Sequence, residues 1–158
     1  MQTRKDRLAQ LQGEWTAAEI SVSYKLGTKT DIPITGTGDV YPVILSFWNM
    51  EFINIQEQMM AFYLNGRGKV MGYRLLCTGS MTECTIDVRL LVSLALHTLA
   101  TSVILAHNHP SGSLRASVND IKTTAQIKKA LKLINVKLWD HLIISETGWL
   151  SMFKEGLM

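Results

Sequence analysis

A short apolar run at 101–106 leads directly into His107-Asn108-His109, and Ser117-Val118-Asn119-Asp120 follows a few residues later. The run has the composition of a strand. Ser117 and Asp120 have the spacing of a helix capping box, in which the first residue is the N-cap. A strand, a turn built from Pro110, Ser111 and Gly112, and a helix are therefore expected in direct succession.

Helices and strands alternate along the rest of the chain. Apolar periodicity predicts strands at 18–26, 59–64, 70–76, 101–106, 136–144 and 150–153, and helices at 39–48, 87–100 and 117–134. Asn65-Gly66-Arg67-Gly68 separates two of the strands, and Asn-Gly between such runs is a strong hairpin signal. The alternation and the hairpin together predict an α/β sandwich with a mixed sheet. In the helix at 117–134, the expected inward stripe is Ile121, Ile127 or Lys128, Leu131 and Ile134.

Length and composition favour one compact domain. The chain has 158 residues, 47% of them hydrophobic, which is enough for a proper core. We expect this domain at 18–158, with 1–17 forming a helix or a flexible segment. Cys77 and Cys84 match no zinc or redox motif, so they are expected to be reduced and in or near the core. The first fifteen residues are charged and lack the apolar region of a signal peptide, and no stretch approaches the roughly 18 apolar residues of a membrane span. Both observations favour a soluble, cytoplasmic protein.

The two histidines predict a metal site. Residues at i and i+2 of an extended segment point to the same face, so His107 and His109 can reach one ion, and Asp120 can supply a third ligand from the next element. Three protein ligands leave a fourth position for water, and Zn²⁺ held in this way lowers the pKa of its bound water to about 7. The alternative is that each residue has only a local role, as helix cap or turn former.

A hydrolytic metal site usually needs a general base close to the bound water. The candidates are Glu51, Glu57, Glu83 and Asp87. Glu57 is preferred because it stands at the entry of the strand expected at 59–64, whereas Glu51 is further from any regular element and Glu83 lies in a polar loop.

The motif resembles that of the RadC branch of the JAB/MPN metallohydrolases, also called JAMM proteins. The resemblance is carried by His107-Asn-His109-Pro-Ser-Gly, by Ser117-x-x-Asp120 and by Trp139-Asp-His141-Leu-Ile-Ile144. It extends over 18–158 and is strongest to short RadC-type proteins of Bacteroidetes. Where relatives usually have Pro-Ser, this chain has Ala116-Ser117, which changes no expected ligand.

The resemblance implies an α-β-α sandwich like that of cytidine deaminases, with His107, His109 and Asp120 as zinc ligands. It also implies that Glu57 is the general acid/base, and that Ser117 donates a hydrogen bond to the water or the oxyanion. The expected function is a zinc-dependent hydrolase of the metallopeptidase or isopeptidase type, acting on a protein or peptide amide that the sequence does not identify. His141 is expected to be buried and hydrogen-bonded, and His97 to lie at the surface; the oligomeric state is left open.

Two other functions remain open. The net charge is +3, and five lysines without an acid lie between Ile121 and Trp139: Lys122, Lys128, Lys129, Lys132 and Lys137. They are either a solvated helix face or a surface for an anionic partner, and the DNA-repair label of RadC-type proteins implies DNA. The third reading is a zinc-binding scaffold without catalysis.

Overall fold

The computed structural model describes residue 34, residues 37–81 and residues 83–158. The strand expected at 18–26 and the segment 1–17 lie outside these residues. The elements in chain order are α2 (Thr37–Phe47), the short 3-10 helix η1 (Met50–Phe52), β1 (Gln58–Leu64), β2 (Val70–Thr78), α3 (Val88–His97), β3 (Ser102–Asn108), α4 (Val118–Leu133), β4 (Lys137–Ile144) and β5 (Trp149–Ser151).

The five strands form one mixed sheet in the order β2-β1-β3-β4-β5. The predicted hairpin is confirmed, because β1 and β2 are antiparallel neighbours joined by the turn at 65–69. β1 also pairs antiparallel with β3, and β5 with β4. β3 and β4 are parallel, so they need a crossover connection, and α4 supplies it.

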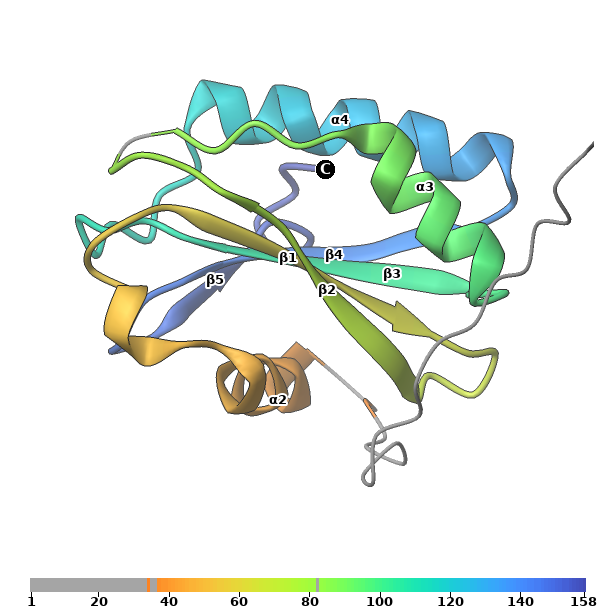
Figure 1. Cartoon of the computed structure of the whole chain (residues 1–158), viewed down its shortest axis with the longest axis horizontal. Helices are drawn as coiled ribbons and strands as arrows, with labels where there is room; N and C mark the ends of the chain where they lie inside the picture. Colours follow the sequence, from red (N-terminus) through yellow and green to blue (C-terminus); the bar gives the residue numbers. More distant parts are fainter. Residues whose placement is uncertain (1–33, 35–36, 82) are drawn as a thin grey trace, which may run out of the picture.

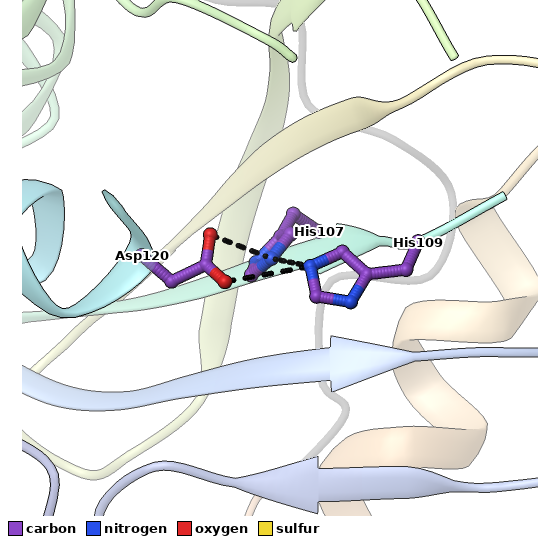
Figure 2. Close-up of side chains that lie close together, drawn as sticks. All are labelled: His107, His109 and Asp120. Atoms are coloured by element: carbon purple, nitrogen blue, oxygen red, sulfur yellow. Dashed lines mark hydrogen bonds and ion pairs between the residues drawn. The ribbon is translucent and has the colours of Figure 1, made fainter. Parts of the chain in front are cut away.

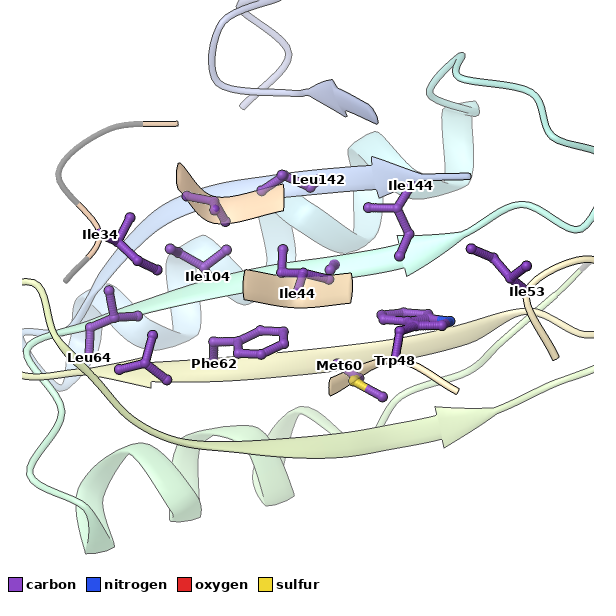
Figure 3. Packing of buried hydrophobic residues seen from close by; sticks show 13 residues of the cluster. Ile34, Ile44, Trp48, Ile53, Met60, Phe62, Leu64, Ile104, Leu142 and Ile144 are labelled. Carbon is purple, nitrogen blue, oxygen red and sulfur yellow. The ribbon is translucent and has the colours of Figure 1, made fainter. Parts of the chain in front are cut away.

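Helices cover both faces of the sheet, which confirms the α-β-α sandwich (Figure 1). On one face, α2 packs on a core that includes Ile44, Phe62, Ile104 and Leu142 (Figure 3). On the other face, α3 and α4 pack on a second core. Its buried members are Ala61, Tyr63, Leu91, Ala95, Ala100, Val103, Leu105, Ile127, Leu131, Val136 and Leu138. Successive residues of β3 alternate between the two cores, as strand geometry requires.

The inward face that the sequence predicted for α4 is only partly correct. Ile121 is exposed, and the buried positions are Asp120, Thr124, Ile127 and Leu131. Their spacing of four, three and four residues is that of one helix face. The helix presents this face to the sheet because Asp120 turns towards the histidines of β3. The last strand is also displaced: it covers Trp149–Ser151 and ends before Phe153.

The expectation of two reduced cysteines is wrong. Cys77, near the end of β2, forms a disulfide with Cys84, which lies seven residues further along the chain. The bond closes the loop between them. Cys84 is buried and Cys77 partly buried, so the expected burial holds. The two cysteines therefore give no support to the expectation that the protein works in a reducing compartment. In the described part of the chain, no helix is long and apolar enough to span a membrane.

Candidate metal centre

Three side chains from two consecutive elements meet at one end of the sheet (Figure 2). His107 lies near the end of β3 and His109 just beyond it, while Asp120 lies in the first turn of α4. The two Nε2 atoms are 3.0 Å apart. Asp120 brings Oδ1 to 3.2 Å from Nε2 of His107 and Oδ2 to 3.4 Å from Nε2 of His109. The motif predicted this convergence, and these side chains can hold one metal ion.

A chain of hydrogen bonds determines which nitrogen of His107 carries a proton. Thr124 donates its hydroxyl proton to the backbone oxygen of Asp120 at 2.6 Å, so its oxygen accepts from Nδ1 of His141, also at 2.6 Å. Nε2 of His141 then accepts from Nδ1 of His107 at 2.8 Å. The lone pair of His107 Nε2 therefore points towards Asp120 and His109. Burial lowers the pKa of His141 well below its ordinary value, which keeps this imidazole neutral, as the chain requires.

The same reasoning applies to His109. Its Nδ1 lies 2.9 Å from the backbone oxygen of Ser113. A carbonyl oxygen can only accept, so Nδ1 carries a proton, and in the neutral ring Nε2 presents a lone pair. Such a hydrogen bond to the far ring nitrogen is the usual way in which proteins orient a metal-binding histidine.

The donor set therefore fits a metal ion. With both rings in these neutral tautomers, two imidazole lone pairs and one carboxylate face each other. The hydrogen bond to Asp120 raises the pKa of His109, so a metal ion would compete with a proton in the shared space. Burial alone would raise the pKa of Asp120, but hydrogen bonds with the side chains of His107 and His109 hold this pKa well below its ordinary value. The carboxylate is ionised, and nitrogen and oxygen ligands of this kind suit Zn²⁺.

Ser117 caps α4, as the sequence predicted. Its Oγ accepts from the backbone N–H of Asp120 at 3.1 Å, and its own N–H donates to Asp120 Oδ2 at 2.6 Å. The capping box therefore also orients the carboxylate. In these contacts Ser117 Oγ acts as an acceptor, so its hydroxyl proton is available to a group in the cavity that it lines.

Glu57 lies just before β1, on the same side of the sheet as the histidines. The β1–β3 ladder ends at the pair of Met59 and His107. Two residues further along each strand, the same register would place Glu57 opposite His109. Residues opposite each other in an antiparallel pair point to the same face. Burial raises the pKa of Glu57, and the nearby His107 and His109 partly oppose this shift.

The disulfide-closed loop supports Glu57. The backbone N–H of Glu57 donates to the oxygen of Ser80, and its oxygen accepts from the N–H of Gly79, both at 2.8 Å. Gly79 must be glycine, because a Cβ there would clash with the backbone oxygen of Glu83. The loop also contributes Met81 to a cavity of about 360 Å³ beside the histidines, which Glu57, His109, Arg115, Ser117 and Asp120 also line.

The other predicted positions lie away from this cavity or act indirectly. Glu51 is exposed in η1, which corrects the expectation that it is far from a regular element. Asp87 caps α3 and pairs with Arg89. His97 is exposed and His141 fully buried and hydrogen-bonded, which confirms both expectations.

Sequence reasoning missed two residues of the centre, Thr124 and Asn108. Thr124 has a detectable signal, since it is a polar residue at position i+4 from Asp120, on the helix face that turns inward. Asn108 looks like an ordinary turn former between the histidines. The structure instead buries it completely.

A strand that ends in His-x-His, followed by a helix whose capping box supplies an aspartate, defines a JAB-type domain on this α-β-α sandwich. The model of the RadC-like JAB domain family matches residues 34–157. The chain belongs to this family, as the resemblance of its motifs indicated.

Relatives of the chain have uninformative names. A UPF0758 protein of Porphyromonas gingivalis is 43% identical over 104 residues, which are 65% of this chain and 46% of that protein. A UPF0758 protein of Flavobacterium johnsoniae is 42% identical over 101 residues, 64% of this chain and 44% of that protein. The match therefore spans less than half the length of these curated relatives.

Proposed function

We propose that this protein is a zinc-dependent hydrolase that cleaves an amide bond in a protein or peptide. The observation that carries the proposal is the meeting of three potential ligands, His107 Nε2, His109 Nε2 and the Asp120 carboxylate, beside a cavity lined by Glu57. A zinc ion at these ligands supplies a Lewis acid and an acidified water.

The chain's own residues have distinct parts in this reaction. Glu57 takes the proton of the attacking water and returns it to the leaving amine, for which its raised pKa is suited. Ser117 donates its hydroxyl proton to the oxyanion that forms when the carbonyl is attacked. His141 and Thr124 hold the imidazole of His107 with its lone pair towards the ion.

Metal content and turnover test the proposal together. The protein is purified without added metal, and its zinc is measured by elemental mass spectrometry. The zinc-loaded protein is then incubated with a library of peptides and lysine-linked isopeptides, and cleavage is followed by mass spectrometry. We expect about one zinc per chain and cleavage of a subset of the library. Wild-type protein that neither contains zinc nor takes up added zinc would contradict the proposal.

Glu57→Gln separates catalysis from metal binding. Because the amide cannot accept a proton, we expect full zinc content and a loss of cleavage of about 10²–10⁴-fold, the usual contribution of general acid–base catalysis. Glu51→Gln is the matched control, since Glu51 is exposed in η1, and it should cleave like wild type. A Glu57→Gln protein with undiminished turnover would remove Glu57 from the mechanism. A wild type that binds zinc and cleaves nothing would favour the scaffold.

The exposed face of α4 supports a second candidate function, the binding of DNA. Lys122, Lys128, Lys129 and Lys132 are all exposed on this helix, and Lys137 is exposed at the start of β4. Such a face would contact phosphates without base preference, and the affinity would fall steeply with salt. Fluorescence anisotropy with duplex DNA at two salt concentrations tests this, with Lys128→Gln/Lys132→Gln as the variant that should weaken binding.

A further inference from the structure

Asn108 lies between the two metal-facing histidines but points to the opposite side of the sheet. Alternation along β3 places it with Ile104 and Ala106, which belong to the core under α2. Its side chain is completely buried. A buried amide is costly unless its polar atoms are hydrogen-bonded, so its partners indicate its role.

The amide of Asn108 makes three hydrogen bonds, all to the backbone of one segment. Its Oδ1 accepts from the N–H of Gln58 at 2.8 Å. Its Nδ2 donates to the oxygen of Ile53 at 2.6 Å and to the oxygen of Gln56 at 3.0 Å. The side-chain NH₂ has two protons, and both are used.

These bonds hold the residues on either side of Glu57. The β1–β3 ladder ends at the pair of Met59 and His107. Beyond this pair, the side chain of Asn108 accepts a hydrogen bond from the backbone N–H of Gln58. The bond to Gln56 fixes the preceding residue. Gly79 and Ser80 hold the backbone of Glu57 itself. The side chain of Asn108 therefore links the two chain neighbours of Glu57 to the residue that lies between His107 and His109.

We propose that Asn108 is a positioning residue that fixes Glu57 relative to His107 and His109, and so sets the distance between the general base and the metal ion. This inference rests on the proposed function, because it assumes that Glu57 acts as the base. Asn108 touches neither the cavity nor the metal ligands' donor atoms. An apolar residue would fill the same space in the core under α2, but it would leave the segment 53–58 without its attachment to β3.

A double-mutant cycle tests the inference without a known substrate. The variants are Asn108→Ala, Glu57→Gln and the combination of the two. The probe is acetohydroxamate, which chelates a zinc ion through two oxygens and gives its hydroxyl proton to an adjacent carboxylate. Its dissociation constant is measured by calorimetry on zinc-loaded protein, and the zinc content of each variant by elemental mass spectrometry.

We expect all variants to hold zinc like wild type. Glu57→Gln should weaken hydroxamate binding by about tenfold, the effect of one lost hydrogen bond to a charged group. Asn108→Ala should cause a similar loss, and the combined variant should bind no more weakly than Glu57→Gln alone. Such non-additivity shows that Asn108 acts through Glu57.

Tyr41→Phe controls for a merely structural effect. It removes the hydrogen bond from the Tyr41 hydroxyl to the backbone oxygen of Ser145, which also lies on the α2 side of the sheet. It should leave hydroxamate affinity unchanged. If Asn108→Ala does not fold, Asn108→Asp serves instead, because it keeps the size and the acceptor for Gln58 and loses both donors; the same non-additive loss is expected.

Failure of the inference and failure of the proposed function give different results. Losses that add in the combined variant, or an Asn108 variant with wild-type hydroxamate affinity, overturn the positioning role and leave the zinc hydrolase intact. A wild type that takes up no zinc, or that holds zinc and binds no hydroxamate, overturns the proposed function and the inference with it.

Discussion

The two ends of the layer between α4 and the sheet differ in chemistry. Towards the C-terminus of α4, Ile127 and Leu131 pack on Val103, Leu105 and the other members of an apolar core. Towards its N-terminus, the same helix face presents Thr124 and Asp120 to His107 and His141, and all four are buried. One end resembles an ordinary core, whereas the other buries polar groups that satisfy each other through hydrogen bonds.

This contrast indicates a division of labour along one helix. Apolar burial stabilises the fold by about 25 cal/mol per Å² of surface removed from water. Buried polar groups contribute little net stability even when they are paired. We therefore expect substitutions at the apolar end to change stability and substitutions at the polar end to change metal binding.

Asp120→Ala should have the largest effect on metal binding. It removes one of the three proposed ligands, so the loss of zinc affinity should exceed the about 10–100-fold cost of losing a supporting hydrogen bond. Stability should fall by only about 1 kcal/mol through the weakened capping box. Zinc titration and thermal unfolding of metal-free protein measure the two effects, and a variant that keeps its zinc would contradict the proposed site.

Ile127→Ala should do the reverse. Removing a completely buried side chain at the apolar end should lower the free energy of unfolding by about 3 kcal/mol. Zinc affinity at a temperature where the protein is folded should stay at the wild-type value. Urea unfolding with parallel zinc titration tests this; a large loss of affinity would show that the two ends are coupled.

His141→Ala should weaken zinc binding by about 10–100-fold, although His141 is not among the proposed ligands. It removes the acceptor for Nδ1 of His107 and so frees the ring to rotate or change tautomer. His97→Ala is the matched control, because His97 is an exposed histidine on α3. Equal zinc affinities of the two variants would refute the hydrogen-bond chain.

Thr124→Val should have the smallest effect, a loss of zinc affinity of about tenfold or less. The substitution keeps the shape of the side chain and removes the oxygen that accepts from His141 Nδ1. Nuclear magnetic resonance of the imidazole nitrogens should then show a mixture of tautomers at His141. A single unchanged tautomer would mean that Thr124 does not set it.

Much of the fold was predictable because its signals are local. The capping box gave the start of α4, and Asn65-Gly66 gave the β1–β2 turn. The strand before His107 was visible from its composition. Ile121 was misplaced because hydrophobicity alone ranks it above Asp120, whereas the histidines of β3 attract the carboxylate and set the rotation of the helix.

The site was predictable only where its residues form one motif. His107, His109, Ser117 and Asp120 lie within fourteen residues, so their spacing is informative. Asn108 acts through partners that are close in space only, such as Ile53, which no local pattern reveals. Thr124 could have been found from its position four residues after Asp120, but its partner His141 could not. The disulfide was missed for the same reason: the spacing of Cys77 and Cys84 fits no motif, and pairing depends on how β2 leaves the sheet.

The capping box of α4 has a consequence for the lifetime of the protein. The carboxylate that orients the first turn is also a proposed metal ligand, so an ion bound there would link the N-terminus of α4 to the end of β3. A ligand that binds only the folded state raises its stability by about 4 kcal/mol at a thousandfold excess over its dissociation constant. Under the proposed function, the loop at 109–116 should therefore be the first segment to loosen when zinc is scarce, and digestion by proteases should begin there.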